Sequence, residues 1–205
     1  MEQQTILRRY TLGGVFGNAT GQVMLNPIAM RIERLLVTMM TASVPTTPEL
    51  DALFKLLHEA SDPGDRSDAE QRIWAIWSGH EDADAAHAMR NAIAALDSGD
   101  LTAADRELTM MVERWPNWAE AWNRRATLRF VEERDAESLD DIERTLELEP
   151  RHFGALSGFG QICFRAHDIS SALLAFEHAV AVNPNMNSIR QAAEVLRKHD
   201  LRTIH

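Results

Sequence analysis

The sequence predicts an all-α solenoid in which one pair of helices is repeated three times. Three prolines, Pro116, Pro150 and Pro184, are evenly spaced, each at position i+34 from the one before, in a chain of 205. Proline lacks the backbone N–H and disfavours helix in the residue before it, so each is expected to end the second helix of its unit. A sequence period of about 20 to 50 residues is typical of stacked repeats.

Small and large residues recur with the same period as the prolines. If each unit ends two residues past its proline, the repeats are 85–118, 119–152 and 153–186. In every unit, small residues fall where the two helices must cross, and a large apolar residue fills the space beside them. The small residues are Ala92, Ala126, Gly160, Ala104, Ser138 and Ala172, and the large ones are Leu108, Ile142 and Phe176.

A turn is expected between the two helices of each unit. In the first unit it falls at Gly99, because glycine readily takes a positive φ. The three expected turns are Gly99-Asp100, Arg134-Asp135 and His167-Asp168.

With this period and these crossings, the chain resembles the tetratricopeptide repeat (TPR) family over about half its length. The strings Trp122–Thr127 (WNRRAT) and Glu149–Leu156 (EPRHFGAL) are similar to a bacterial subgroup of that family to which no activity is assigned. The resemblance implies a helical solenoid that binds other proteins, and it names no partner.

Helical segments flank the three repeats. Residues 187–205 are expected to form a capping helix and tail, because a solenoid needs a cap over the apolar face of its last repeat. Residues 49–84 are expected to form a degenerate first helix pair, which starts after Thr47 and is broken near Pro63. The predicted architecture is therefore three clear repeats, one degenerate N-terminal repeat and a C-terminal capping helix.

The segment 1–48 differs in composition and is expected to be a flexible leader or a targeting-like segment. It carries about +2 of formal charge, against about −12 for the rest of the chain. Arg8-Arg9 faintly resembles a twin-arginine signal, and Met30–Arg34 before an apolar run has the order of a secretory signal. Export to the periplasm and a cytoplasmic location both stay open. A further hypothesis makes 28–40 a lid that folds back over the solenoid's concave groove.

Charge and residue content exclude several classes of function. The formal net charge is −10 and the isoelectric point is near 5.2, so nucleic acids and anionic membranes are not expected partners. No run approaches the roughly 18 apolar residues of a membrane span. Cys163 is the single cysteine and is expected to be a buried structural thiol. We expect no enzyme activity, no catalytic residues, no metal and no cofactor.

The first helix of each repeat should line the concave face, and its side chains are the candidate partner site. This groove is more apolar than a solvated surface, which predicts an amphipathic helix or extended peptide docked through Met89, Ile93, Phe130 and Phe164. Family members that clamp a terminal carboxylate use lysines and asparagines here. In this chain Met89, Ile93 and Gly154 replace them, so that ligand is disfavoured, and Asn123 is the one residue of that kind. The candidates are Met89, Ile93, Leu96, Asn123, Thr127, Phe130, Ser157, Gln161, Phe164 and Arg165.

Two alternatives to an interaction scaffold or adaptor remain. An anion or cofactor could bind where Arg124, Arg125, Arg151 and His152 gather near the starts of first helices. The chain could also be a structural subunit of a larger assembly. Its oligomeric state stays open.

Overall fold

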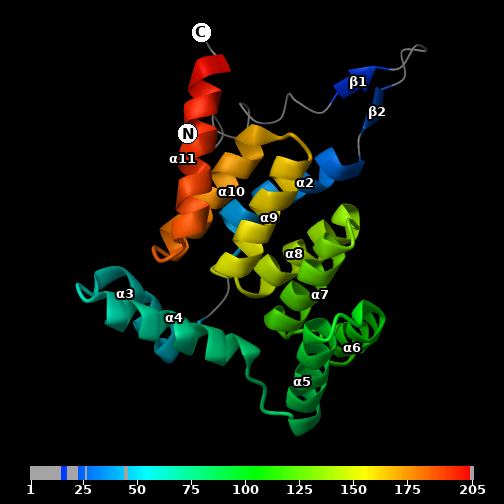
Figure 1. Cartoon of the computed structure of the whole chain (residues 1–205), viewed down its shortest axis with the longest axis vertical. Coiled ribbons are helices and arrows are strands. Elements are labelled where there is room, and N and C mark those ends of the chain that lie inside the picture. The colour runs from blue at the N-terminus through cyan, green and yellow to red at the C-terminus, as the bar shows by residue number, and fades with distance from the viewer. Residues whose placement is uncertain (1–14, 18–22, 26, 44–45, 204–205) are drawn as a thin grey trace.

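In the computed structural model of the chain (Figure 1), the structure describes residues 15–17, 23–25, 27–43 and 46–203. These residues form ten helices and one short antiparallel hairpin, which confirms an all-α solenoid. The hairpin pairs β1 (Val15–Gly17) with β2 (Val23–Leu25) ahead of the first helix. The helices are α2 (Pro27–Thr41), α3 (Pro48–Glu59), α4 (Pro63–Ser78), α5 (Ala83–Asp97), α6 (Leu101–Arg114), α7 (Ala119–Val131), α8 (Asp135–Leu148), α9 (Phe153–Arg165), α10 (Ile169–Val182) and α11 (Asn187–Thr203).

The three helix pairs α5–α6, α7–α8 and α9–α10 keep the period of the prolines. Their second helices begin at Leu101, Asp135 and Ile169, which are spaced as evenly as the prolines are. Each second helix ends two residues before its proline, as the missing N–H and the restriction on the preceding residue require.

The turn inside each pair is made by one residue with a left-handed backbone. Gly99, Glu133 and His167 have φ of 76°, 59° and 61°, and they recur with the same period. The middle turn therefore centres on Glu133 rather than on the expected Arg134-Asp135. Asp100 and Asp168 cap the following helices through the amides of Ala103 and Ser171, whereas Arg134 has no side-chain acceptor to offer.

Close helix crossing explains the glycine at the centre of the third pair. A Cβ on Gly160 would lie 2.4 Å from two ring carbons of Phe176 across the α9–α10 crossing. Phe159, Leu156 and Cys163 are fully buried in the same apolar cluster. Burial raises the pKa of the Cys163 thiol well above its usual range, so this thiol is a structural part of the core.

Helix α2 packs on second helices rather than over the groove. Its Ile32, Leu35, Leu36 and Met39 are buried in one cluster with residues of α8 and α10, on the far side of α9 in Figure 1. Arg34 and the carboxylate of Glu143 form an ion pair across that contact. The hypothesis that residues 28–40 form a lid over the groove is therefore wrong, because the groove is lined by first helices. The signal-like segment that starts at Met30 falls mostly in α2, where Met30 and Val37 are exposed, and Arg8-Arg9 lies outside the described residues.

Helix α11 covers the end of the solenoid. Its Ala193 and Leu196 are buried against α10, while the opposite face of the helix is exposed. The apolar face of the last repeat is thus shielded from water, as a terminal repeat requires.

The helices α3 and α4 form the expected pair, but they do not stack on α5 and α6 as a preceding repeat would. Figure 1 shows the pair running across the lower ends of α9, α10 and α11. Its apolar cluster joins Leu57 and Ile73 to Phe153 at the start of α9, to Val182 at the end of α10 and to Met186 before α11. Among the described residues, the cluster around α5 and α6 contains no side chain of α3 or α4. We call residues 48–78 the strap.

Candidate functional site: a groove in two halves

The concave groove of the second and third repeats is divided into a covered and an open half. The covered half lies near the starts of α7 and α9, where the strap and neighbouring turns bury the surface. Its residues are Glu120, Asn123, Gly154 and Ser157. The open half lies toward the ends of the same helices. Its residues are Thr127, Phe130, Gln161, Phe164 and Arg165.

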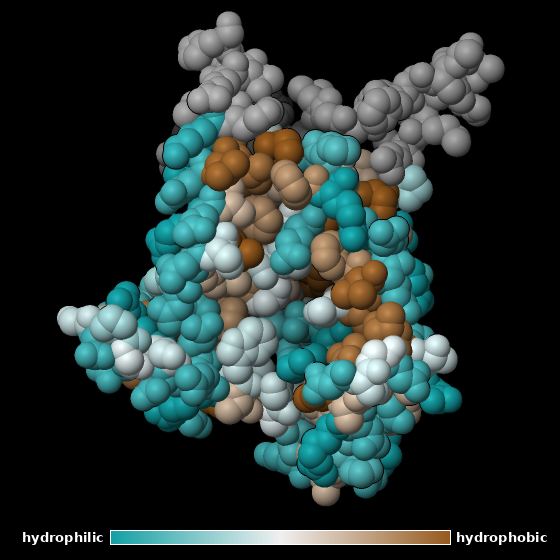
Figure 2. All heavy atoms as spheres, in the orientation of Figure 1, coloured by the Kyte–Doolittle hydropathy of each residue, from teal (hydrophilic) through white to brown (hydrophobic). Residues whose placement is uncertain are grey.

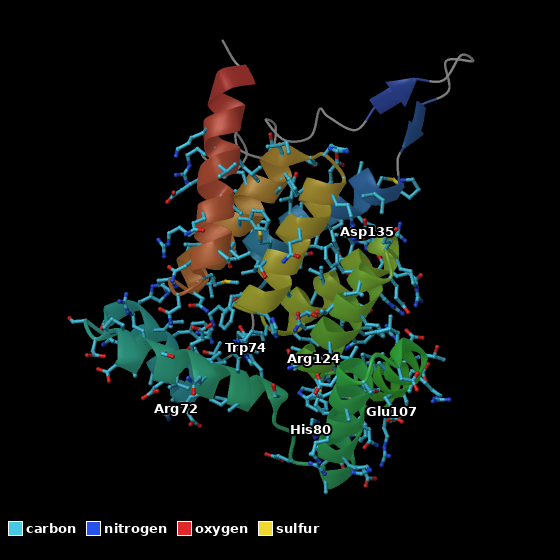
Figure 3. The ribbon with its side chains drawn as sticks, in the orientation of Figure 1. Arg72, Trp74, His80, Glu107, Arg124 and Asp135 are labelled. Atoms are coloured by element: carbon cyan, nitrogen blue, oxygen red, sulfur yellow. The ribbon has the colours of Figure 1, made fainter. Side chains whose placement is uncertain are left out.

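A tryptophan of the strap closes the covered half. A Cβ on Gly154 would lie 2.8 Å from Cη2 of Trp74, so only glycine leaves room for the indole ring. Figure 3 shows Trp74 where α4 meets the start of α9, near Arg124. The same ring packs edge-on against Phe153, at 5.0 Å between centroids. The group that approaches Gly154 closely is thus a side chain of this protein and not of a partner.

A buried polar cluster lies under the strap. Glu120 is fully buried, and its carboxylate accepts hydrogen bonds from Asn123 Nδ2 at 2.9 Å and from Arg124 Nε at 2.6 Å. His152 Nδ1 accepts from the amide of Ala155, so Nε2 carries the ring proton and donates to Glu120 at 3.1 Å. Burial raises the pKa of Glu120, but the hydrogen bond from His152 and the Arg124 cation outweigh it and hold that pKa below its usual value.

The open half is an apolar cleft that extends from the groove to the capping helix. The cleft between α7, α9 and α11 has a volume of about 610 Å³. Phe164 is 52% exposed on one wall and Val195 is 65% exposed on the other. Figure 2 shows apolar surface gathered between α9 and α11. Phe130, Ile189 and Ala192 complete its apolar lining.

The polar rim of the cleft carries little free charge. Arg165 pairs with Asp135 and places its guanidinium 3.9 Å from the centre of the Phe130 ring. Gln161 and Gln191 are uncharged. The open half therefore offers apolar contacts and amide groups instead of a cationic clamp.

The first repeat contributes less to the groove than the sequence suggests. Met89 is buried in the cluster with Leu108 and Met111, so it does not reach the groove and the prediction of Met89 as an anchor is wrong. Ile93 and Leu96 are partly buried against the same cluster.

The four residues of the alternative anion site do not converge. Arg124 pairs with Glu120, Arg125 with the buried carboxylate of Asp141 at 2.8 Å, and Arg151 with Asp51 at 2.8 Å. His152 is buried beneath Trp77, with ring centroids 4.2 Å apart. Arg124 and His152 both donate to the carboxylate of Glu120, while Arg125 and Arg151 pair with other carboxylates, so all four side chains are held by groups of this chain.

Sequence reasoning missed the residues that come from outside the three repeats. The exposed Val195 belongs to a helix that the sequence predicted only as a cap. Val195 precedes the inward-facing Leu196, and that position did not indicate that the helix has a second apolar face. The sequence pattern indicates Trp74 and Trp77 only as core positions of a degenerate repeat.

Comparison with known proteins now decides the family. No known family profile matches the sequence. A TPR repeat-containing protein of Rhizobium etli is 32% identical over 170 residues, which cover 83% of this chain and 83% of that protein. The chain belongs to the tetratricopeptide repeat family. A solved structure of the TPR2B domain of yeast Sti1 in complex with pHsp70 is similar with a TM-score of 0.53 at 18% identity, and covers 58% of this chain and 99% of that domain.

Tetratricopeptide proteins are in general interaction adaptors without enzymatic chemistry. No group of three or more metal-ligating side chains is found in the part of the chain that the structure describes. No helix among the described residues is long and apolar enough to cross a membrane.

Proposed function

We propose that this tetratricopeptide protein is an adaptor that holds an amphipathic helix or extended peptide of a partner protein in the open half of its groove. The observation that carries the proposal is the apolar cleft between α7, α9 and α11, with Phe164 and Val195 more than half exposed on facing walls. Exposed apolar surface of this kind, rimmed by polar side chains, is typical of a docking site.

The chemistry of the cleft favours apolar side chains in the partner. Fully burying a Phe or Val side chain contributes about 1.5–3 kcal/mol, so covering the exposed parts of these two side chains would contribute a few kcal/mol to binding. A partner's free carboxylate would find Arg165 already paired with Asp135. The related Sti1 domain has been solved in a complex with pHsp70, which supports use of this solenoid geometry for binding.

Site-specific photo-crosslinking in cells of the source organism tests the proposal. A photoreactive phenylalanine analogue is placed at Phe164 or at Val195, and at Val37 of α2 as a matched control that is 44% exposed on the opposite side of α9. We expect the same partner adduct from both cleft positions and not from the control. A second substitution, Phe130→Glu, should abolish that adduct without lowering the melting temperature of the protein by more than a few degrees.

Two results would count against the cleft. One is an adduct pattern that is the same at all three positions, which would indicate collision and not docking. The other is the absence of any adduct at the two cleft positions in cells that contain the full proteome.

A further inference from the structure

The strap occupies the half of the groove that the proposed site leaves closed. Trp74 fills the space over Gly154, and Trp118 Nε1 donates a hydrogen bond of 2.7 Å to the backbone oxygen of Trp77. We propose that the strap is a displaceable internal ligand, and that a partner helix gains the whole groove only when the strap leaves. This inference rests on the proposed function, because it concerns the regulation and the partner of that same groove.

The two tryptophans of the strap meet the solenoid at one aromatic point. The Trp77 ring stacks on His152 at 16° between planes, and the Trp74 ring meets the same imidazole edge-on, at 5.6 Å between centroids. Phe153 packs against both indoles. Release of the two tryptophans would undo the contacts that close the groove, and the apolar contacts of the strap with Val182 and Met186 would have to be given up as well.

Besides its apolar contacts, which include Phe54 beneath the Arg151 guanidinium at 4.2 Å, the strap makes several polar ones. Glu70 accepts hydrogen bonds from Asn183 and Asn185, and His58 shares one with the backbone oxygen of Val182. Asp51, which pairs with Arg151, has a side chain that is 54% exposed. Water can replace the exposed pair of Asp51 and Arg151 at small cost, whereas Asn183 is fully buried and its amide would need a new partner.

The docked interface leaves polar groups unsatisfied. Within the described residues, Trp77 Nε1 and Arg151 Nη2 are buried and have no hydrogen-bond partner. A buried donor without an acceptor loses its hydration and gains nothing in return, so undocking relieves a cost.

Displacing the strap would join the two halves into one continuous site. The covered half would then present the cavity over Gly154, beside the polar side chains of Asn123 and Ser157. The partner that fits is a helix with an aromatic side chain at the place of Trp74 and aliphatic side chains for the cleft beside Phe164. One end of such a helix would make the contacts that the strap now makes, and the other end would fill the open cleft.

Hydrogen exchange of the full chain, followed by mass spectrometry, tests the strap without any partner. Gly154→Ala puts a methyl group against Trp74, while Gly158→Ala is a control on the same helix, where a Cβ would meet only Ile142 Cδ1 at an ordinary 3.6 Å. Both changes add a methyl group to α9, but only the methyl group at Gly154 meets the strap, and it also lies 3.3 Å from the His152 ring. We expect Gly154→Ala to speed exchange in α3 and α4 by about tenfold or more, with α7–α10 unchanged and the control like wild type.

Trp74→Ala removes the same contact from the strap's side and should give the same pattern. The inference is overturned if α3–α4 and α7–α10 always change together, because the strap would then be an integral layer of the fold. It is also overturned if neither Gly154→Ala nor Trp74→Ala changes exchange in α3 and α4. These outcomes leave the crosslinks at Phe164 and Val195 untouched, so the two proposals fail separately.

Discussion

Replacing Glu120 with alanine is expected to destabilise the protein by about 3–4 kcal/mol, because two of its three donors are buried. His152 is fully buried and Asn123 is 8% exposed, so neither can turn to water when the carboxylate is gone. Each buried donor left unpaired costs about 1–3 kcal/mol, which gives about 2–6 kcal/mol for the two. The Arg124 side chain is 33% exposed and can be hydrated, so it adds little.

Urea unfolding of Glu120→Ala, followed by circular dichroism, measures this loss. With a slope of about 2 kcal/mol per molar urea, the midpoint should fall by about 1.5–2 M at an unchanged slope. Glu147→Ala is the matched control, since Glu147 sits one helix later with a side chain 47% exposed in a surface pair with Arg144. Such pairs contribute about 0–1 kcal/mol, so the control should unfold within about 0.5 M of wild type. The reasoning is refuted if Glu120→Ala unfolds at the same urea concentration as the control.

The helix crossings and buried carboxylates support three more predictions. Gly160→Ala should destabilise by about 1–3 kcal/mol despite alanine's higher helix propensity, because its methyl group collides with the ring across the helix crossing; a raised melting temperature would contradict this. Asp141→Ala should cost about 3–5 kcal/mol in urea unfolding, because it leaves Arg125 and Arg129 nearly buried without their carboxylate, and a loss below about 1 kcal/mol would show that they find water instead. The folded pKa of Glu120 lies below the unfolded value of about 4.3, so its stabilising contribution is complete above that pH and is lost as pH falls through the folded pKa. Acid titrations should show a shallower loss for Glu120→Ala than for wild type, and parallel curves would exclude this role.

Much of the repeat core followed from the sequence. The prolines at 116, 150 and 184 placed the helix ends, because the effect of proline on the backbone is local and independent of the rest of the fold. The small residue at Gly160 indicated a close crossing for the same reason, since backbone approach is limited by a single Cβ. The middle turn was misplaced by one residue because Glu133 gives no glycine signal at its left-handed position.

The candidate site was only half predictable. Phe130, Gln161, Phe164 and Arg165 lie in the open half as the repeat register indicated. The repeat register alone could not show that Met89 packs inside its own helix pair. A residue on the apolar stripe of a first helix can face either the second helix of its pair or the groove.

The repeat unit could be read from local sequence alone, because its length, its two helices, its turn and its crossing are all set by residues of a single period. The positions of the segments outside the repeats depend instead on contacts between residues that are far apart in the sequence. Trp74 of the strap meets Gly154 of the third repeat, and Arg34 of α2 pairs with Glu143 of α8. Such contacts carry no period and depend on which apolar faces the finished solenoid leaves uncovered. For that reason the strap and the open cleft became visible only in the folded chain.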